Sequence, residues 1–438
     1  MQPNKHIYFS GIGGSGLFPL ALMAHQCGYR ISGSDVEINE NTKQLAALGI
    51  DIAYHQDGVF MQGVHEHTPI DWLVVSSAIP PDSPEISYAS KQGIRVSKRD
   101  GLIGEIIAKN NLKMVAVAGT HGKTSTTSMM IWTLDQLGAS PSYIVGGLPA
   151  FGPAGAYETS SDLFVYEADE FDRNFLNFKP YLSIITTMDY DHPDTYLNED
   201  EYYQAFAEFI SNSAAVFTWE DIYKNISELV GSADKQEDIH TIKDDQSETK
   251  QLLDSIDLLG AHNRRNGLLV LEAVKSLLPD VSEEDIIKAI NSFPGVARRL
   301  EKIAENIYSD YAHHPTEIAA TLQALGEKFD KISVVYQPHQ NIRQHQVRGM
   351  YKEAFIGTSQ LYWLPTYLSR EDPNLPVIEA QELLSEVDDN TLKSYKAVVD
   401  MDDELVASLK KDLDDGYVVV FMGAGSIDAW AKHQFALA

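Results

Sequence analysis

The chain has 438 residues, 34 of them basic and 63 acidic, for a formal net charge of −29, and 44% of its residues are hydrophobic. This length predicts about three domains, and the apolar content excludes global disorder. The acidic excess repels polyanions, which excludes a nucleic-acid scaffold and a binder of anionic membranes. Small phosphorylated ligands are compatible with it, because a few local donors outweigh the mean field.

The cysteine content and the N-terminal pattern predict the compartment. Cys27 is the one cysteine, which excludes an intrachain disulfide framework and a cysteine zinc site. The sequence shows no signal-peptide pattern and no apolar run of the ~18 residues that a membrane span needs. We therefore expect a cytoplasmic protein without a membrane partner.

Short apolar runs alternate with helical patterns along the whole chain. Continuous apolar strands are typical of parallel sheets that carry helices on both faces, so the fold class is α/β. The expected strands are 6–9, 72–75, 114–117, 163–166, 182–185, 332–335 and 417–420. The polar segment 231–249 is expected to be a loop or an irregular excursion.

Two turn-like segments suggest domain boundaries. Lys109-Asn110-Asn111 precedes a new strand, and Phe293-Pro294-Gly295 separates a helical stretch from another strand series. The predicted domains are 1–108, 109–294 and 295–438. The middle one holds 13 basic and 30 acidic residues and carries most of the net charge.

A first glycine loop follows the expected strand 6–10. Gly11, Gly13 and Gly16 fill the Gly-x-Gly-x-x-Gly pattern, which lets backbone amides approach a diphosphate at a helix N-terminus. Asp35 follows the second strand, where such folds place a ribose-binding acid. The pattern fits NAD as well as another nucleotide diphosphate, and it also fits a turn kept only for close packing.

A second phosphate loop is formed by Gly119-Thr120-His121-Gly122-Lys123-Thr124, between a strand and a helical stretch. Its amides can cradle phosphates, its lysine can reach the β and γ oxygens, and its threonine can bind Mg²⁺. The strict pattern has glycine where this chain has Val117, so the loop is a compressed variant. This loop predicts ATP binding.

Acidic residues follow two of the expected strands. Glu167-Ala168-Asp169-Glu170 comes after one, and Asp189-Tyr190-Asp191-His192 comes after another. Open α/β sheets place their chemistry at these carboxyl ends, and a hard cation prefers oxygen ligands. We expect Glu167 and His192 to bind magnesium; the alternative is ordinary solvated acids.

A polar helix face lies further along the chain. His262, Asn263 and Asn266 are three or four residues apart and therefore lie near one another on a helix. Their donors and acceptors suit a purine edge or a phosphate. A plain polar helix face is the alternative.

Taken together, these motifs resemble the Mur ligases over nearly the whole chain. The motifs, in chain order, are Gly-Thr-His-Gly-Lys-Thr, Glu-Ala-Asp-Glu, Asp-His, His-Asn-x-x-Asn, Arg298-Arg299, Ser309-Asp310-Tyr311-Ala312-His313-His314-Pro315-Thr316-Glu317 and Gln337-Pro338-His339. The resemblance implies a UDP-binding Rossmann-like domain, a central P-loop ATPase domain, and a C-terminal Rossmann-like domain that closes over ATP and admits an amino acid.

The implied reaction is ATP-dependent ligation of L-alanine to the carboxylate of UDP-N-acetylmuramate through an acyl phosphate, in peptidoglycan precursor synthesis. ATP and Mg²⁺, or Mn²⁺, would take part, and the first glycine loop would hold a UDP-sugar rather than NAD. Three alternatives stay open: a sister ligase that adds a preformed tripeptide, an NAD-dependent dehydrogenase, and a non-catalytic nucleotide-binding module. The sequence does not give the oligomeric state.

The resemblance also assigns site residues. The catalytic set is Lys123, Glu167, His192, Arg299 and Asp310, and the metal set is Thr124, Glu167 and His192. The ATP set is Gly119, Thr120, His121, Gly122, Lys123, Thr124, Ser125, Asn263, Asn266, Arg299 and Asp310. The UDP-sugar set is Gly11, Gly13, Gly14, Ser15, Gly16, Asp35, Ser76 and Ser77. Tyr311, His313, His339 and Arg343 would face the sugar acid and the amino acid.

One arginine that the family pattern leads us to expect is absent from this chain. The family motif usually reads Gln-Pro-His-Arg-Tyr-x-Arg, and here Gln340 replaces the first arginine while Arg343 is retained. The loss of one cation weakens carboxylate recognition, so the choice of amino acid is open at this point.

Overall fold

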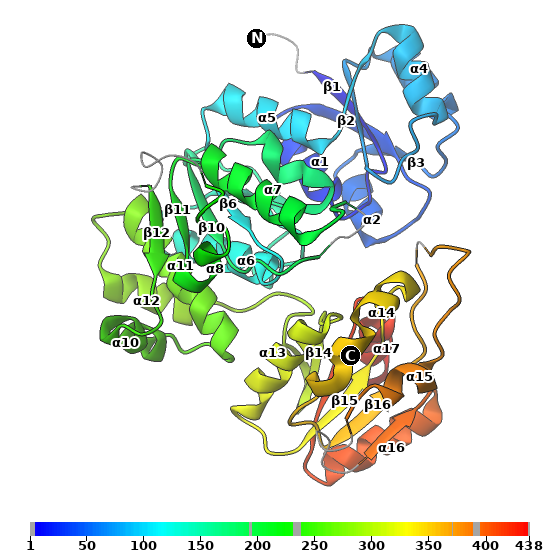
Figure 1. Ribbon diagram of the computed structural model, residues 1–438. Coiled ribbons are helices and arrows are strands. Elements are labelled where there is room, and N and C mark those ends of the chain that lie inside the picture. Colours follow the sequence, from blue (N-terminus) through cyan, green and yellow to red (C-terminus); the bar gives the residue numbers. More distant parts are fainter. Residues whose placement is uncertain (1–4, 192–194, 231–237, 370, 389–394, 437–438) are drawn as a thin grey trace. The chain divides into compact units, whose positions relative to one another are not determined.

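The structure is a computed structural model that describes residues 5–191, 195–230, 238–369, 371–388 and 395–436. The chain divides into two compact units, residues 1–255 with 266–294 and residues 256–265 with 295–438. The described strands form three sheets, two in the first unit and one in the second. Figure 1 colours them along the chain, and each unit is described by itself.

The first sheet has the strand order β3-β2-β1-β4-β5 among the described residues, and all its strands are parallel. The apolar run of β1 is fully buried, as expected for a central strand with helices on both faces. Its strands are β1 (His6–Ser10), β2 (Arg30–Ser34), β3 (Asp51–Ala53), β4 (Trp72–Val75) and β5 (Arg95–Ser97). Its helices are α1 (Phe18–Gln26), α2 (Glu40–Ala47), α3 (Val59–His67), α4 (Pro84–Gln92) and α5 (Arg99–Asn110).

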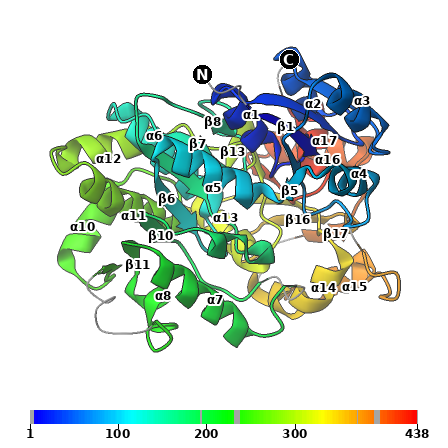
Figure 2. The ribbon, with the colours of Figure 1, turned by 90° about the horizontal axis from the view of Figure 1, so that it is seen from above.

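The central sheet has the order β12-β11-β10-β6-β9-β7-β8 in the described part of the chain, and only β8 is antiparallel. Helix α12 packs against α6, as Figure 2 shows from above. The strands are β6 (Lys113–Ala118), β7 (Ser142–Ile144), β8 (Gly155–Ala156), β9 (Leu163–Glu167), β10 (Leu182–Ile185), β11 (Val216–Trp219) and β12 (Ile239–Ile242). The helices are α6 (Lys123–Gln136), η1 (Phe171–Asn177), α7 (Glu199–Asn212), α8 (Glu220–Lys224), α10 (Ser247–Ser255), α11 (Ala261–Leu277) and α12 (Glu283–Asn291).

The second unit contains a sheet of order β13-β14-β18-β15-β16-β17 within the described ranges, parallel except for β13. Two apolar clusters, built around Trp363 and Phe421, form its core. The strands are β13 (Glu301–Ala304), β14 (Ile307–Asp310), β15 (Ile332–Tyr336), β16 (Gln360–Trp363), β17 (Tyr395–Val398) and β18 (Val418–Met422). The helices are α13 (Pro315–Gly326), α14 (Asn341–Val347), η2 (Arg348–Glu353), α15 (Ala380–Ser385), α16 (Asp403–Asp414) and α17 (Ile427–Phe435).

The structure confirms the α/β class and all seven expected strands, with ends that agree to within two residues. The expectation of an irregular segment at 231–249 is wrong for its described part. Residues 239–242 form β12, because they gain a hydrogen-bonded neighbour in β11. Helix α10 begins at Ser247. Residues 231–237 lie outside the described residues, and the two domain boundaries stay predictions.

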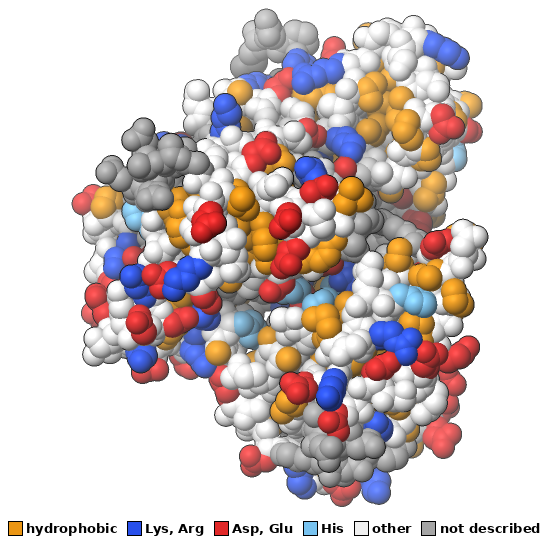
Figure 3. Space-filling view, in the orientation of Figure 1, with side chains coloured by type: hydrophobic (Ala, Val, Ile, Leu, Met, Phe, Trp, Pro, Cys, Tyr) orange, Lys and Arg blue, Asp and Glu red, His pale blue; other side chains and the backbone are white. Residues whose placement is uncertain are grey.

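The described surface carries both signs of charge. Figure 3 shows acidic side chains interspersed with basic ones on the face in view. Among the described residues, no helix combines the length and the apolar character that a membrane crossing requires.

Candidate functional site

The first glycine loop lies at the carboxyl ends of β1 and β2. The backbone N–H groups of Gly11 and Ile12 both donate to the Ser34 carbonyl, at 2.8 and 3.0 Å. Gly11 has a φ of +83°, a left-handed conformation that favours glycine. A Cβ at Gly13 would lie 2.5 Å from the Thr42 methyl group, so only glycine lets α2 approach this closely.

Asp35 holds this loop. Its side chain is buried, and one carboxylate oxygen accepts the Gly13 N–H at 2.8 Å while the other accepts the N–H groups of Val36 and Glu37 at 2.8 and 3.1 Å. The structure therefore brings Asp35 to the predicted loop with both oxygens bonded to backbone. Its contact with a ribose stays a prediction.

The remaining predicted UDP-sugar residues lie around the same loop. Ser76 follows β4, which pairs with β1, and its N–H donates to the Ser10 carbonyl at 3.0 Å. A Cβ at Gly11 would lie 3.0 Å from the Ser76 Cβ. Gly14, Ser15 and Ser77 are exposed, so they are accessible to a ligand.

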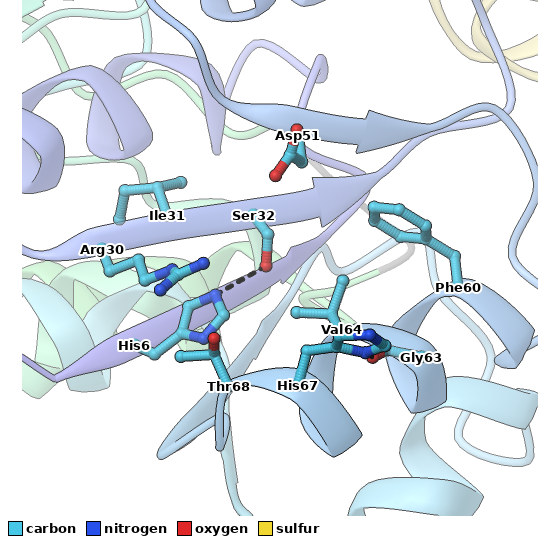
Figure 4. A pocket seen from close by; sticks show the side chains of 10 residues that line it. All are labelled: His6, Arg30, Ile31, Ser32, Asp51, Phe60, Gly63, Val64, His67 and Thr68. Carbon is cyan, nitrogen blue, oxygen red and sulfur yellow. Dashed lines mark hydrogen bonds between the residues drawn. The ribbon is translucent and has the colours of Figure 1, made fainter.

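A cavity of about 320 Å³ opens at the opposite edge of the same sheet (Figure 4). His6, Arg30 and Asp51 begin three strands there, and the His6 Nε2 lies 2.9 Å from the Ser32 hydroxyl. Burial lowers the pKa of His6. This cavity lies at the amino ends of the strands, so it is separate from the glycine loop.

The second phosphate loop connects β6 to α6 and requires glycine at both ends. Gly119 has a φ of +137° and Gly122 a φ of +81°. A Cβ at Gly119 would lie 2.2 Å from the Thr186 hydroxyl and 2.8 Å from the Thr187 carbonyl oxygen. The residues just after β10, the strand that pairs with β6, thus fix the loop: the Thr187 hydroxyl accepts the His121 N–H at 2.8 Å.

Other polar contacts complete this loop. The Thr120 hydroxyl donates to the Asp189 carbonyl at 2.7 Å and also lies 2.6 Å from the Tyr202 hydroxyl. The His121 Nε2 lies 3.7 Å from the Asp189 carboxylate. Ser125 follows in the first turn of α6 and is half-buried.

Lys123, the first residue of α6, folds back over the loop. Its Nζ donates to the Gly119 carbonyl at 2.6 Å and the Thr120 carbonyl at 3.2 Å, and it pairs with the Glu170 carboxylate at 2.8 Å. Burial by itself lowers the pKa of Lys123, but Glu170 and Asp169 outweigh it and raise that pKa. Lys123 is therefore a cation at neutral pH, held at the loop.

Thr124 and Glu167 bring two oxygen ligands together. The Thr124 hydroxyl donates to one Glu167 carboxylate oxygen at 2.9 Å, and the other oxygen accepts the Gly146 N–H at 2.7 Å. Burial raises the pKa of Glu167, and a cation would oppose that shift.

This donor set fits magnesium, which takes one or two carboxylates together with substrate phosphates and water. His192, the third predicted ligand, lies outside the described residues. Among the described residues, no group of three or more His, Cys, Asp or Glu side chains is arranged to hold a metal ion.

The predicted nucleotide asparagines occupy different settings. Asn266 is buried, and its Nδ2 would lie 2.8 Å from a Cβ at Gly122, so it adjoins the second phosphate loop. Asn263 belongs to the segment 256–265 of the other unit, where its Nδ2 donates to the Leu259 carbonyl at 2.8 Å. The prediction that both contact the nucleotide stays a prediction.

In the second unit, Asp310 is the last residue of β14, and its side chain bonds to the backbone just after Arg298 and Arg299. Its carboxylate accepts the N–H groups of Leu300 and Ala312 at 2.7 and 2.8 Å. Burial raises the pKa of Asp310, and the nearby Arg299 opposes this. The guanidinium of Arg299 also lies 4.9 Å from the centre of the Tyr311 ring.

The four predicted substrate residues of this unit lie close together. The His313 ring is 5.3 Å from the Tyr311 ring and 6.0 Å from the His339 ring, and the charge of Arg343 acts on His313. His313 Nδ1 lies 3.1 Å from the Tyr311 carbonyl, which can only accept, so Nδ1 carries the proton. Burial lowers the pKa of His313 to about 4, which keeps the ring neutral at pH 7.

Gln340, at the departure from the family motif, has a positive φ of 63°. Its N–H donates to the Tyr367 carbonyl at 2.9 Å, and the Tyr367 ring stacks on His339 at 5.7 Å. The unusual backbone thus connects the two loops that carry His339 and Tyr367.

Sequence reasoning missed two residues of the first unit. Glu170 belongs to a predicted acidic run, and its fully buried pairing with Lys123 sets it apart from its neighbours. Arg99, at the start of α5, lies beside Gly16 and pairs with Asp169. A lone arginine tens of residues away from both Gly16 and Asp169 carries no sequence signal.

Three family models match the chain in order. Residues 6–111 match the Mur ligase family catalytic domain, 117–274 the Mur ligase middle domain, and 298–425 the Mur ligase glutamate ligase domain. The chain belongs to the Mur ligase family, and its three sheets fit the family's three-domain architecture.

Within this family, the chain is similar to UDP-N-acetylmuramate–L-alanine ligases. That of Fusobacterium nucleatum is 32% identical, over 99% of this chain and 96% of its own length, and that of Desulfosudis oleivorans is 33% identical, over 97% and 96%. The crystal structure of the Thermotoga maritima UDP-N-acetylmuramate-alanine ligase has a TM-score of 0.73 at 25% identity and covers 98% of both chains.

Proposed function

We propose that this protein joins L-alanine to the carboxylate of UDP-N-acetylmuramate, with ATP as the energy source. The observation that carries the proposal is the second phosphate loop, whose Lys123 and Thr124 lie against the acids Glu170 and Glu167. The similarity to alanine ligases over nearly the whole chain supports this choice of substrates. In this proposal the reaction belongs to peptidoglycan precursor synthesis and takes place in the cytoplasm.

The reaction has two steps. The muramate carboxylate attacks the γ-phosphorus of ATP, which gives an acyl phosphate and ADP. The alanine amine then attacks the acyl carbon, and phosphate leaves. Because this chemistry needs little covalent participation from the protein, the chain acts chiefly by positioning and by neutralising charge.

Residues of the first unit would bind the two nucleotides. Amides of the loop 119–122 cradle the ATP phosphates, and Lys123 supplies a cation to the transferring group. Thr124, Glu167 and His192 would hold Mg²⁺ or Mn²⁺, which supplies charge neutralisation on the phosphates when bound. The loop 11–16, with Asp35, Ser76 and Ser77, would hold the UDP-sugar.

Residues of the second unit would complete the reaction. Asn263, Arg299 and Asp310 serve ATP in this proposal, together with Asn266 of the first unit. Tyr311, His313, His339 and Arg343 face the sugar acid and alanine. The neutral His313 has Nε2 available as a hydrogen-bond acceptor, which suits orienting the alanine amine.

An ADP-release assay tests this function. ADP should appear when UDP-N-acetylmuramate, L-alanine and ATP are all present, with glycine, L-serine and the preformed tripeptide as competing acceptors. ATP hydrolysis at the same rate without alanine would contradict a ligase. Preference for the tripeptide would favour the sister ligase, and tight NADH binding without UDP-sugar binding would favour a dehydrogenase.

A further inference from the structure

Arg99 lies between the first glycine loop and the acidic turn of the central sheet. Its Nη2 donates to an Asp169 carboxylate oxygen at 3.3 Å. Its Nη1 would lie 3.1 Å from a Cβ at Gly16. One guanidinium therefore lies next to the end of a proposed diphosphate loop and bonds to a carboxylate of the acidic turn.

Gly16 leaves room for this arginine. Gly11 needs glycine for its left-handed φ, whereas Gly16 has no such backbone requirement. The neighbour that a Cβ at position 16 would meet is the Arg99 side chain. A glycine at this point keeps the guanidinium next to the loop backbone, where a diphosphate at the N-terminus of α1 would lie.

The guanidinium retains donors for a ligand. It has five N–H groups, and among the described residues its hydrogen bond to Asp169 is the one found. Its side chain is 22% exposed, so part of it is open to solvent. Asp169 is itself fixed, because its other oxygen accepts the Phe171 N–H at 3.1 Å. A carboxylate held in this way orients the guanidinium of Arg99 so that its remaining N–H groups can bind a phosphate.

We infer that Arg99 binds the diphosphate of the nucleotide sugar at the first glycine loop, and that Asp169 is its positioning residue. The inference rests on the proposed function for the identity of the sugar nucleotide. It adds a cation to the loop 11–16, whose own residues provide backbone amides and the Ser15 hydroxyl. The neighbouring pair Lys98–Asp172 also joins α5 to the acidic turn region, and its residues do not contact Gly16.

The test is calorimetric titration of UDP into the full-length wild type and the variants Arg99→Ala, Arg99→Lys and Lys98→Ala. We expect Arg99→Ala to raise the dissociation constant of UDP at least tenfold and Arg99→Lys to restore part of the loss. Lys98→Ala should change it less than twofold. The KM for UDP-N-acetylmuramate should rise in parallel in Arg99→Ala, while the KM for ATP stays unchanged.

Unchanged UDP binding in Arg99→Ala would overturn the inference. An equal loss in Lys98→Ala would also overturn it, because the arginine would then act only by tying elements together. Thermal unfolding of each variant identifies a folding defect. Arg99→Lys, which keeps the positive charge, is the control in case Arg99→Ala does not fold. A wild type that binds UDP through Arg99 but ligates no alanine would refute the proposed function alone.

Discussion

The pair Lys123–Glu170 is the most constrained ionic contact at the second phosphate loop. The Glu170 side chain is fully buried, and the lysine is 14% exposed. Removing one partner of such a pair leaves a buried charge without its counter-ion, which costs more than losing an exposed pair.

Lys123→Ala should therefore lower the free energy of unfolding by about 3 kcal/mol and abolish ADP release. The matched variant Lys123→Ala with Glu170→Gln removes both charges, so it should recover most of the stability and none of the activity. Urea unfolding and the ADP-release assay measure the two effects. Equal stability of the single and double variants would contradict the buried-pair argument.

His313 determines the direction in which the free energy of unfolding changes with pH. Its pKa in the folded protein is about 4, below the ordinary value of 6.5, because burial disfavours the charged ring. As the pH falls, His313 is therefore protonated at a higher pH in the unfolded chain than in the folded protein. The contribution of neutral His313 to the free energy of unfolding is complete above pH 6.5 and is lost between pH 6.5 and 4.

His313→Asn should reduce the acid sensitivity of folding. Asn has no titrating group and keeps a donor for the Tyr311 carbonyl. Between pH 7.5 and 5.5 the wild type should lose about 1 kcal/mol more unfolding free energy than this variant. Urea unfolding at both pH values measures the difference, and parallel losses in the two proteins would show that His313 does not titrate in this range.

At the scale of an element, α6 depends on the glycines that flank it. Gly119 and Gly138 both have positive φ values, +137° and +79°. A Cβ at Gly119 would meet backbone and side-chain oxygens, whereas a Cβ at Gly138 would meet nothing within 4 Å. The two positions therefore separate backbone strain from a steric clash.

Gly138→Ala should cost about 1 kcal/mol of stability and leave activity unchanged, since only the left-handed conformation is penalised. Gly119→Ala adds a clash that must displace the loop, so we expect a larger loss of stability and at least a hundredfold drop in ADP release. Urea unfolding and the same assay compare them. Similar activity in both variants would refute the steric role of Gly119.

At the scale of the whole molecule, the two units divide the proposed binding tasks. The UDP-sugar residues belong to the first unit, and His339 belongs to the second. His339→Ala should raise the KM for alanine about tenfold, because it removes a ring from the proposed alanine site. It should leave UDP binding unchanged in calorimetry. A matching loss of UDP affinity would argue against this division of tasks.

The sequence by itself determined the α/β class, the seven strands and the two phosphate-type loops. Continuous apolar runs, glycine spacing and strand–loop–helix order are local properties, so they are readable without knowing the fold. The acidic excess of the middle region was also readable, and Figure 3 shows acidic side chains on the surface, interspersed with basic ones.

Only the tertiary structure decided which side chains meet. It paired Lys123 with Glu170, bonded Asp35 to the glycine loop, placed Arg99 between Gly16 and Asp169, and made a strand of the polar residues 239–242. These outcomes depend on strand order and burial, which bring together residues tens of positions apart. Local sequence patterns carry no information on such contacts, because the pairing free energy arises only after the sheets have formed.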